Sequence, residues 1–457
     1  MQRAIDPSTG RPLREAPFAD AAAIEAALAA AAAAVPGWAA AGFAGRATVL
    51  RDVARLLRED VADLAPLMTE EMGKPIREAR GEVEKAAWAA EHYAQHGEAY
   101  LARWTLPSDA THSYVQHLPL GTVLGVLPWN APFWLAFRFC APALMAGNTC
   151  LMKHDLHVPA CAEAIGALFE RVGAPAGVFR NLPMDHDAVA TVLRDPRVHA
   201  VSYTGSERGG GAVAALAAAE IKPAVLELGG SDPCIVLADA DLEAAADVIT
   251  TSRIINAGQS CIAAKRIIVE APVHDRLAAM LEERLAALSV GDPRSSHTDV
   301  GPLARDDLRD NLHRQVRESI DAGARCRLGG TLPAGDGFYY PVTLLTGVTP
   351  AMTVAREETF GPVMVLMRAA DEAEALALAN DTPYGLAGSI WTDASRGEAL
   401  AARLAAGQVA VNGIVKTDPR LPSGGIKRSG IGRELGPHGI LAFVNAQQVW
   451  VGPKRGA

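Results

Sequence analysis

Residues 123–153, VLGVLPWNAPFWLAFRFCAPALMAGNTCLMK, contain an apolar run, a helical stretch and a second apolar run. We expect strands at Val123–Leu127 and Thr149–Lys153, with a helix over Phe133–Met145 between them. Short apolar runs that alternate with helices are typical of buried parallel strands. This segment therefore predicts one β-α-β unit of a parallel sheet.

The same alternation continues as far as residue 228. Further strands are expected at Gly177–Leu182, His199–Tyr203 and Ala224–Leu228, with helices at Pro159–Val172, Asp187–Arg194 and Gly210–Glu220. Five strands that alternate with four helices predict a doubly wound sheet. In such sheets ligands bind at the carboxyl ends of the strands.

A second alternating set predicts another α/β domain. Its expected strands are Cys234–Leu237, Ile267–Val269, Val363–Met367, Gly388–Trp391 and Val409–Asn412, separated by helices such as Asp241–Asn256 and His274–Leu288. The last segment, Asn445–Gly452, is a short apolar strand with nothing after it to pair with. A lone terminal strand is an exposed edge, and joining another subunit's sheet would cover it.

The first hundred residues predict helices that break at Gly42, at Gly73–Pro75 and at Gly97. Ala21–Ala34 is expected to be an amphipathic surface helix, too short and too weakly apolar to span a bilayer. No basic segment precedes an apolar run at the N-terminus, so no secretory signal is expected.

Composition narrows the class of protein. The chain has 457 residues, 49% of them hydrophobic, and a formal net charge of −9, so nucleic-acid and membrane partners are not expected. None of the six cysteines belongs to a CxxC pair or to a Cys/His cluster with zinc spacing. Free thiols, no metal and a reducing cytoplasm are therefore expected.

Three polar residues stand at strand or helix ends where chemistry is expected. Asn130 follows the strand that ends at Leu127, and it either caps the next helix or donates to an oxyanion. Glu227 closes a strand before two glycines, either as a solvated carboxylate or as a general base able to swing. Cys261 lies in the polar loop Asn256–Cys261, which favours a reactive thiolate over a buried hydrophobe.

Two further segments predict dinucleotide binding. The GxGxxG fingerprint is absent after the first strand, and its nearest counterpart is the glycine-rich run Tyr203–Gly211. Small residues there either form a flexible turn or let the backbone approach a pyrophosphate at a helix N-terminus. The carboxylates of Glu357 and Glu358 are either part of a charged loop or hydrogen-bond a ribose.

Taken in order, these segments resemble the aldehyde dehydrogenase superfamily, and within it the short bacterial succinate-semialdehyde dehydrogenases. The match runs from the Asp6–Gly10 turn through Glu71–Pro75 and Thr204–Ser206 to Gly430–Glu434 and the C-terminal strand. The resemblance implies an α/β fold with a Rossmann-like cofactor domain (1–102 and 120–228) and a second α/β catalytic domain (229–427). It also implies a small β oligomerisation element (103–119 and 442–457) and a homo-oligomer, either dimer or tetramer.

The resemblance also assigns roles residue by residue. Cys261 is similar to the family's nucleophile, Glu227 to its general base, and Asn130 with the Cys261 N–H to its oxyanion hole; Glu434 is similar to a proton-relay carboxylate. Implied cofactor contacts are Lys153 and Glu358 at the ribose, Ser206 at the pyrophosphate and Trp129 near the nicotinamide, together with Thr204, Gly205, Gly229 and Phe360.

The implied reaction is NAD(P)-dependent oxidation of an aldehyde to an acid through a cysteine thiohemiacetal and a thioester. If a helix begins near Asn130, then Asn130, Trp134 and Arg138 share one face. Arg138 falls where similar enzymes keep an arginine for the substrate carboxylate, and Arg420 is a second candidate cation. The alternative for Arg138 is a surface salt bridge.

The cofactor and the aldehyde stay open at this point. Leu156 stands where many NAD-specific relatives have a glutamate that binds the ribose, so NAD and NADP are both possible. Ala131 replaces a bulkier aromatic residue, which predicts a wider tunnel. Succinate semialdehyde is the expected substrate. The alternatives are another semialdehyde or an uncharged aldehyde, and, in a different class, a catalytically silent protein on the same fold.

Overall fold

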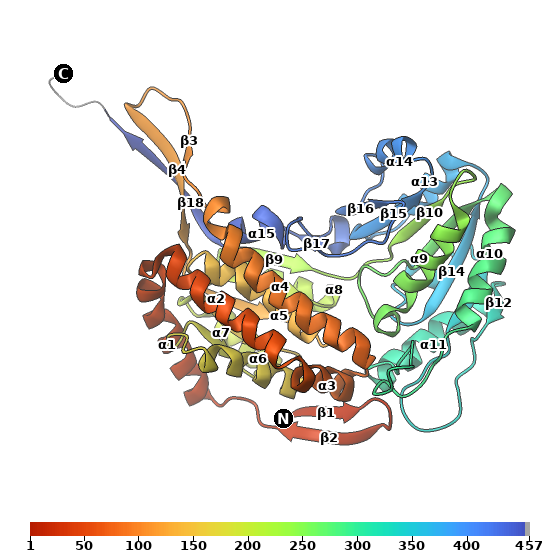
Figure 1. Cartoon of the computed structure of the whole chain (residues 1–457), viewed down its shortest axis with the longest axis horizontal. Coiled ribbons are helices and arrows are strands. Elements are labelled where there is room, and N and C mark those ends of the chain that lie inside the picture. The colour runs from red at the N-terminus through yellow and green to blue at the C-terminus, as the bar shows by residue number, and fades with distance from the viewer. Residues whose placement is uncertain (453–457) are drawn as a thin grey trace.

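The computed structural model describes residues 1–452 as two α/β bodies and a projecting β arm (Figure 1). The first body contains a six-stranded sheet with the strand order β17-β9-β8-β5-β6-β7. Its strands are β5 (Thr122–Val126), β6 (Thr149–Lys153), β7 (Phe179–Asn181), β8 (Val198–Thr204), β9 (Ala224–Glu227) and β17 (Gly430–Ile431). All five strands that the sequence predicts for this sheet are present.

Those five strands are parallel, as their alternation with helices predicts. The connecting helices are α5 (Pro132–Met145), α6 (Pro159–Arg171), α7 (His186–Arg194) and α8 (Glu207–Ala219). β17 joins the edge antiparallel to β9, with Gly430 opposite Glu227. Its two residues carry no alternating pattern, so nothing in the sequence predicts this strand.

Four helices precede the sheet: α1 (Ala21–Ala40), α2 (Gly42–Glu59), α3 (Val61–Met72) and α4 (Ile76–Tyr100). The predicted breaks at Gly42 and at Gly73–Pro75 are confirmed, but the break at Gly97 is wrong because α4 continues through it. A Cβ atom at Gly97 would lie 2.4 Å from Cγ of Met145. The glycine therefore serves the close packing of α4 on α5 and not a helix end.

α1 is longer than the predicted Ala21–Ala34 helix, because it continues through Pro36 to Ala40. Its last turn is held by Trp38, which is buried and whose Nε1 donates to the carbonyl of Leu144 at 3.0 Å. Within residues 1–452, α1 is the one helix long and apolar enough to cross a membrane, so the expectation that this stretch is too short and too weakly apolar is wrong. Ala27, Leu28 and Ala31 nevertheless pack into the core beside the sheet.

The second body contains a seven-stranded sheet with the order β12-β13-β14-β11-β10-β15-β16. Its strands are β10 (Pro233–Val236), β11 (Arg266–Glu270), β12 (Arg325–Leu328), β13 (Thr343–Thr346), β14 (Val363–Ala369), β15 (Ala387–Trp391) and β16 (Gln408–Val411). Its helices are α9 (Leu242–Ile254), α10 (Ala271–Ala286), α11 (Asp306–Asp321), α12 (Thr353–Arg356), α13 (Glu372–Asn380) and α14 (Ala394–Ala401). The five predicted strands are confirmed, and β12 and β13 were not predicted.

The arm is a three-stranded sheet of β3 (Trp104–Thr105), β4 (His112–Pro119) and β18 (Val444–Val451), and it projects away from both bodies (Figure 1). β18 pairs with β4 along its whole length. The expectation of a lone terminal strand is therefore wrong, because its partner precedes it by more than three hundred residues in the chain. Residues 453–457 of the predicted β element lie outside the described residues.

Two smaller elements complete the fold. β1 (Gln2–Asp6) and β2 (Arg11–Ala16) form a hairpin around the predicted turn at Asp6–Gly10. α15 (Gly436–Leu441) leads from β17 to β18 and packs on α4 and α5. The chain segment that follows the second body thus returns to the first, which places Ser423 and Glu434 beside the carboxyl end of β9.

Candidate active site

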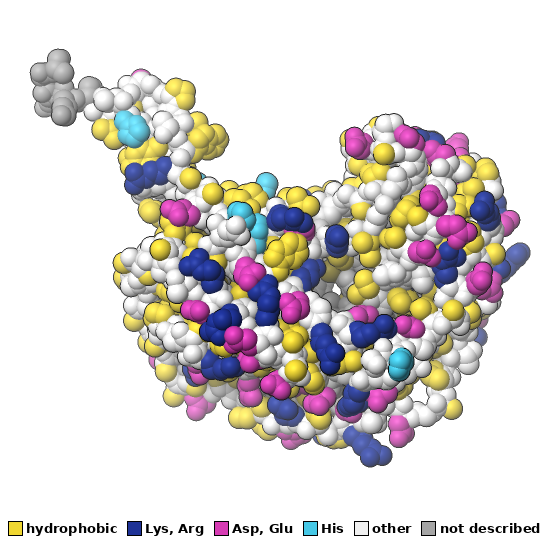
Figure 2. Space-filling view, in the orientation of Figure 1, with side chains coloured by type: hydrophobic (Ala, Val, Ile, Leu, Met, Phe, Trp, Pro, Cys, Tyr) yellow, Lys and Arg dark blue, Asp and Glu magenta, His cyan; other side chains and the backbone are white. Residues whose placement is uncertain are grey.

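The carboxyl end of the first sheet faces the second body, and the molecular surface is hollowed between the two bodies (Figure 2). Lys153, Thr204 and Glu227 are the last residues of the neighbouring strands β6, β8 and β9. Asn130 follows β5, which lies between β6 and β8 in the sheet. These side chains therefore lie at one edge of the sheet, where ligands bind in doubly wound sheets.

Cys261 belongs to a loop whose shape is held on several sides. A short 3₁₀ helix (η1, Ile255–Gly258) precedes it, in which Asn256 and Ala257 have φ values of 56° and 52°. Non-glycine residues rarely adopt this left-handed conformation unless their surroundings enforce it. Here the Asn256 N–H donates to Oε2 of Glu78 at 2.7 Å, and Lys265 Nζ donates to the carbonyl of Cys261 at 2.6 Å. The loop is thus a fixed support for the thiol.

The surroundings of the thiol differ from those of the other cysteines. Cys261 is half-buried, Cys326 is exposed, and the remaining four are fully buried: Cys140, Cys150, Cys161 and Cys234. Within residues 1–452 the backbone N–H of Cys261 donates no hydrogen bond. Cys261 is thus more exposed than the four buried cysteines, and a backbone donor remains available beside its sulfur.

Asn130 is tied directly to this loop. Its Nδ2 donates to the carbonyl of Gln259 at 3.1 Å, two residues before Cys261. Its own carbonyl accepts from Asn256 Nδ2 at 2.8 Å and from Lys74 Nζ at 3.0 Å. The helix-capping alternative is wrong, because the residue before α5 is Ala131 and the side chain of Asn130 makes no hydrogen bond to the first turn of the helix. An amide donor and the thiol loop therefore meet as the sequence predicts.

Glu227 is buried at 2% exposure, so the alternative of a solvated strand-end carboxylate is wrong. Ser423 Oγ donates to Glu227 Oε1 at 3.0 Å, and Arg138 Nη2 donates to Glu227 Oε2. Nε of the same arginine forms an ion pair with Glu434, whose Oε1 accepts from Ser202 Oγ at 3.0 Å. One guanidinium thus joins the two carboxylates that the resemblance assigns to proton transfer.

The position of Arg138 differs from both expectations for it. It is buried, with 2% of its side chain exposed, so it does not form a surface salt bridge. Because α5 begins at Pro132, Asn130 lies outside the helix, and only Trp134 and Arg138 share a helical face. Substrate binding by Arg138 stays a prediction, and in this structure its guanidinium is already occupied by two protein carboxylates.

Replacing Arg138 with methionine should lower the free energy of unfolding by about 3–5 kcal/mol, because it leaves two buried carboxylates without a counter-ion. Denaturant unfolding followed by tryptophan fluorescence measures the change. Arg180→Met is the matched control, since Arg180 and Glu170 form an ion pair that is exposed on both sides and its loss should leave stability nearly unchanged. Equal stability of the two variants would contradict a buried bridging role for Arg138.

The thiol of Cys261 has a raised pKa in this site. Burial raises the pKa, and the positive charges of Arg138 and Lys265 partly oppose that rise. The carboxylates of Glu358 and Asp232 raise the pKa further. Burial therefore disfavours the thiolate that the sequence predicts, while the positive charges of Arg138 and Lys265 favour it.

Comparison with known proteins identifies the family. A family model described as the aldehyde dehydrogenase family matches residues 1–449. The chain belongs to the aldehyde dehydrogenase family. The resemblance, the fold class and the enzyme class expected from the sequence are thereby confirmed.

Other members of the family are similar over their whole length. The succinate semialdehyde dehydrogenase of Escherichia coli, named with NAD(P)+, is 45% identical over 98% of this chain and 97% of its own. That of Mycobacterium avium, named with NADP(+), is 44% identical over 99% of this chain and 97% of its own. The solved structure of succinic semialdehyde dehydrogenase from Streptococcus pyogenes with NADP+ superposes with a TM-score of 0.97 at 34% identity, covering 99% and 100% of the two chains.

The cofactor half of this aldehyde dehydrogenase has the groups that a dinucleotide requires. Thr204 Oγ1 is buried and has no hydrogen-bond partner within residues 1–452, at the point where β8 leads into α8. Ser206 caps α8 by accepting from Gly209 N at 3.2 Å, so the helix N-terminus with its glycines points toward the same edge. Lys153 adds a cation at the end of β6. These donors fit a nicotinamide dinucleotide.

Glu358, Gly229 and Phe360 line the junction between the two bodies. Glu358 Oε1 accepts from Gly230 N at 3.0 Å and lies 3.5 Å from Lys265 Nζ. A Cβ atom at Gly229 would lie 2.4 Å from Oε2 of Glu358, so a larger residue there would displace the Glu358 carboxylate. Phe360 packs edge-on against Trp129 with ring centroids 5.9 Å apart. The predicted ribose carboxylate thus lies beside the Cys261 loop in this structure.

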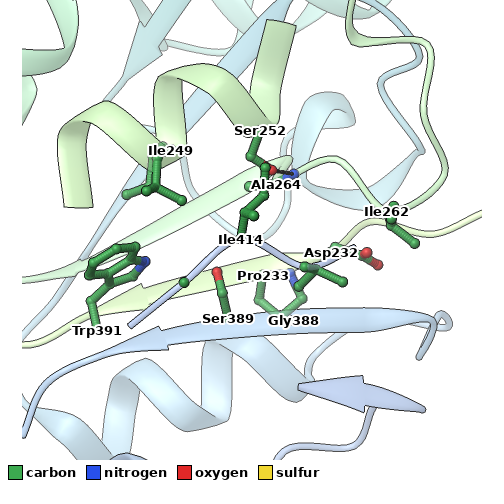
Figure 3. A pocket seen from close by; sticks show the side chains of 13 residues that line it. Asp232, Pro233, Ile249, Ser252, Ile262, Ala264, Gly388, Ser389, Trp391 and Ile414 are labelled. Atoms are coloured by element: carbon green, nitrogen blue, oxygen red, sulfur yellow. Dashed lines mark hydrogen bonds between the residues drawn. The ribbon is translucent and has the colours of Figure 1, made fainter. Parts of the chain in front are cut away.

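A small crevice lies behind the nucleophile loop, between α9, β10, β15 and residues 413–415 (Figure 3). Asp232 and Ile262 line it, and Ala264 N donates across it to Ser252 Oγ at 3.1 Å. Its volume of about 10 Å³ admits no aldehyde or nicotinamide ring.

Several residues that build this site carry no sequence signal of their own. Lys74, Lys85, Glu82, Ser202, Lys265 and Ser423 all contact the predicted site residues or the loops that hold them. Glu82 accepts from the N–H groups of Phe133 and Trp134, so the Glu82 side chain and not that of Asn130 caps α5. Lys74 belongs to the Glu71–Pro75 motif, which is the one signal that could have identified it.

Proposed function

We propose that the protein oxidises succinate semialdehyde to succinate, with NADP or NAD as the hydride acceptor. The observation that carries this proposal is the convergence of Asn130 on the Cys261 loop, with a buried carboxylate at the end of β9. The names of the similar enzymes from E. coli and M. avium support the aldehyde and the cofactor.

Cys261 first loses its thiol proton to water, and Sγ then attacks the aldehyde carbon, which places a negative charge on the former carbonyl oxygen. The N–H of Cys261 and the amide of Asn130 are the donors proposed for this oxyanion, and each such donor typically contributes about 3 kcal/mol of transition-state stabilisation. The bound nicotinamide ring supplies the acceptor for the hydride that leaves the tetrahedral carbon. A thioester on Cys261 remains.

Glu227 then removes a proton from the water that attacks this thioester, and the acid is released. Arg138 holds Glu227 and Glu434 together, but its guanidinium stays charged and carries no proton itself. Protons therefore pass between the carboxylates, directly or through water, with Glu434 as the proposed relay. A buried base at this position favours hydrolysis over transfer of the acyl group to a thiol acceptor.

Use of NADP is supported by the residues beside Lys153. Leu156 offers no carboxylate to repel a 2′-phosphate. The neighbouring Asp155 is engaged by His157, whose N–H and Nδ1 lie 3.0 and 2.7 Å from Asp155 Oδ1. We propose that both NAD and NADP are accepted.

The proposed location and assembly rest on other features. Six free cysteines fit a reducing cytoplasm. Trp104 and Trp450 are 64% and 48% exposed on the projecting arm, and β18 leaves an open strand edge there. Exposed aromatic side chains next to an open edge support a homo-oligomer in which the arm packs on another subunit.

An absorbance assay at the reduced-nicotinamide band tests the proposal by crossing NAD and NADP with succinate semialdehyde, butanal and benzaldehyde. We expect kcat/KM for succinate semialdehyde to exceed that for butanal by about a hundredfold, because a site built around a substrate charge rejects the neutral analogue. Equal values for the two aldehydes would contradict the substrate assignment. No reduction of either cofactor with any aldehyde would contradict the reaction.

A further inference from the structure

Lys85 is a cation beside the reacting groups that the proposed mechanism does not use. It lies on α4 and is half-buried. Its Nζ stands 4.2 Å from the ring centroid of Trp134 and donates to Oγ1 of Thr417 at 2.8 Å. Both partners are neutral, so within residues 1–452 this ammonium group has no carboxylate at ion-pair distance.

The packing of α4 on α5 fixes where this ammonium group stands. Glu82 lies one turn before Lys85 and accepts from the N–H groups of Phe133 at 2.9 Å and of Trp134 at 3.2 Å. α4 is thereby held against the first turn of α5. Trp134 and Arg138 lie four residues apart in α5 and share one face. Because Lys85 stacks on Trp134, it lies on the same face as Arg138, whose guanidinium pairs with Glu227 and Glu434.

The two arginines considered for the substrate carboxylate are already paired with protein carboxylates. Arg138 joins Glu227 and Glu434. Arg420 is exposed, and its Nε and Nη2 donate to the two carboxylate oxygens of Asp418 at 2.9 and 2.6 Å. A substrate anion would have to displace Glu227, Glu434 or Asp418 to reach either guanidinium, whereas at Lys85 it would displace no carboxylate.

We propose that Lys85 is the specificity-determining residue of this enzyme and that it binds the distal carboxylate of the aldehyde, with Trp134 packed along the carbon chain. Arg138 is then a positioning residue for Glu227 and Glu434. The inference rests on the proposed function, because it requires a substrate that carries a carboxylate.

The electrostatics of the site agree with an anionic ligand. Burial and the nearby positive charges of Arg138 and Lys74 lower the pKa of Lys85 to about 8, and the carboxylates of Glu82 and Asp418 oppose this shift. A carboxylate placed next to the ammonium group would favour its charged form and satisfy its unused donors. A neutral aldehyde offers neither interaction.

The test compares the wild-type enzyme with Lys85→Met, which keeps the length of the side chain and removes the charge, and with Lys85→Arg, which keeps the charge. We expect Lys85→Met to raise KM for succinate semialdehyde by about tenfold to a hundredfold, the range for a lost charge-assisted hydrogen bond. Values for butanal should stay within about twofold, and Lys85→Arg should restore most of the affinity.

Calorimetry of the product succinate provides a readout that is independent of turnover. In Lys85→Met the affinity for succinate should fall in parallel with the rise in KM for succinate semialdehyde. Arg309→Met is the matched control, because Arg309 also stacks on an aromatic ring, that of Phe338 at 5.9 Å, in the second body. Arg309→Met should leave KM unchanged for both succinate semialdehyde and butanal.

The outcomes separate this inference from the proposed function. If the wild-type enzyme prefers succinate semialdehyde but Lys85→Met affects both aldehydes equally, or neither, the role of Lys85 is overturned and the substrate assignment stands. If the wild-type enzyme shows no preference for the charged aldehyde, the substrate assignment itself fails, and the role of Lys85 is overturned with it.

Discussion

Cys261→Ala should abolish NAD(P)H formation, with a fall in kcat of at least about 10⁴-fold, because the aldehyde then has no sulfur with which to become tetrahedral. The fold should survive the change. The loop is held through backbone groups of Asn256, Gln259 and Cys261, which the substitution leaves in place. Far-UV circular dichroism and binding of NADP measured by fluorescence check that the variant is intact.

Cys326→Ala is the matched control for this experiment. Cys326 is the exposed thiol among the six and lies in β12 at the edge of the second sheet. Its loss should leave kcat unchanged. Unchanged turnover in Cys261→Ala would refute the covalent mechanism, and loss of activity in both variants would indicate a general effect of thiol removal.

Glu227→Gln should reduce the steady-state kcat by about 10²–10⁴-fold while leaving the first turnover in place. Glutamine keeps the shape of the side chain and its hydrogen bond from Ser423, but it cannot accept a proton from water. The thioester then accumulates on Cys261. Stopped-flow absorbance should therefore show a burst of about one NAD(P)H per active site, followed by a slow steady phase.

Glu357→Gln tests whether this effect is specific. Glu357 is ion-paired with Arg314 at the surface, 2.6 Å from Nη2, and its neutralisation should leave both phases as in the wild-type enzyme. If Glu227→Gln abolishes the burst along with steady turnover, Glu227 is required before hydride transfer. The assignment of Glu227 to the hydrolysis step would then be wrong.

The elements of both sheets could be predicted because buried parallel strands are short apolar runs set between helices. The strand Thr149–Lys153 has the predicted bounds, and the other predicted strands differ only at their ends. Three strands were not predicted, namely β12, β13 and β17. They are short strands at or near a sheet edge and have little hydrophobic pattern of their own. The helix break predicted at Gly97 was wrong because glycine is selected both where a helix ends and where two helices pack closely. Only the close approach of Met145 in the structure shows that the second reason applies at Gly97.

The site was predictable where its chemistry depends on residue type at a strand or helix end. Asn130, Glu227 and Cys261 all meet this description, and the structure places the first beside the loop of the third. The pairing of cations with carboxylates was not predictable. Arg138 and Glu227 lie 89 residues apart in the chain, and Lys85 and Thr417 lie 332 residues apart.

The amino-acid order alone thus determined which runs become buried strands, which helices cover them, and which polar residues stand at the carboxyl edge of the first sheet. That information is local, since a run of apolar residues and the turn that ends it decide a strand without reference to distant segments. Tertiary structure alone decided that Arg138 bridges two carboxylates and that Lys85 has only neutral partners. Charges interact through space, so their partners are set by how α4, α5, β9 and the segment that returns from the second body pack together.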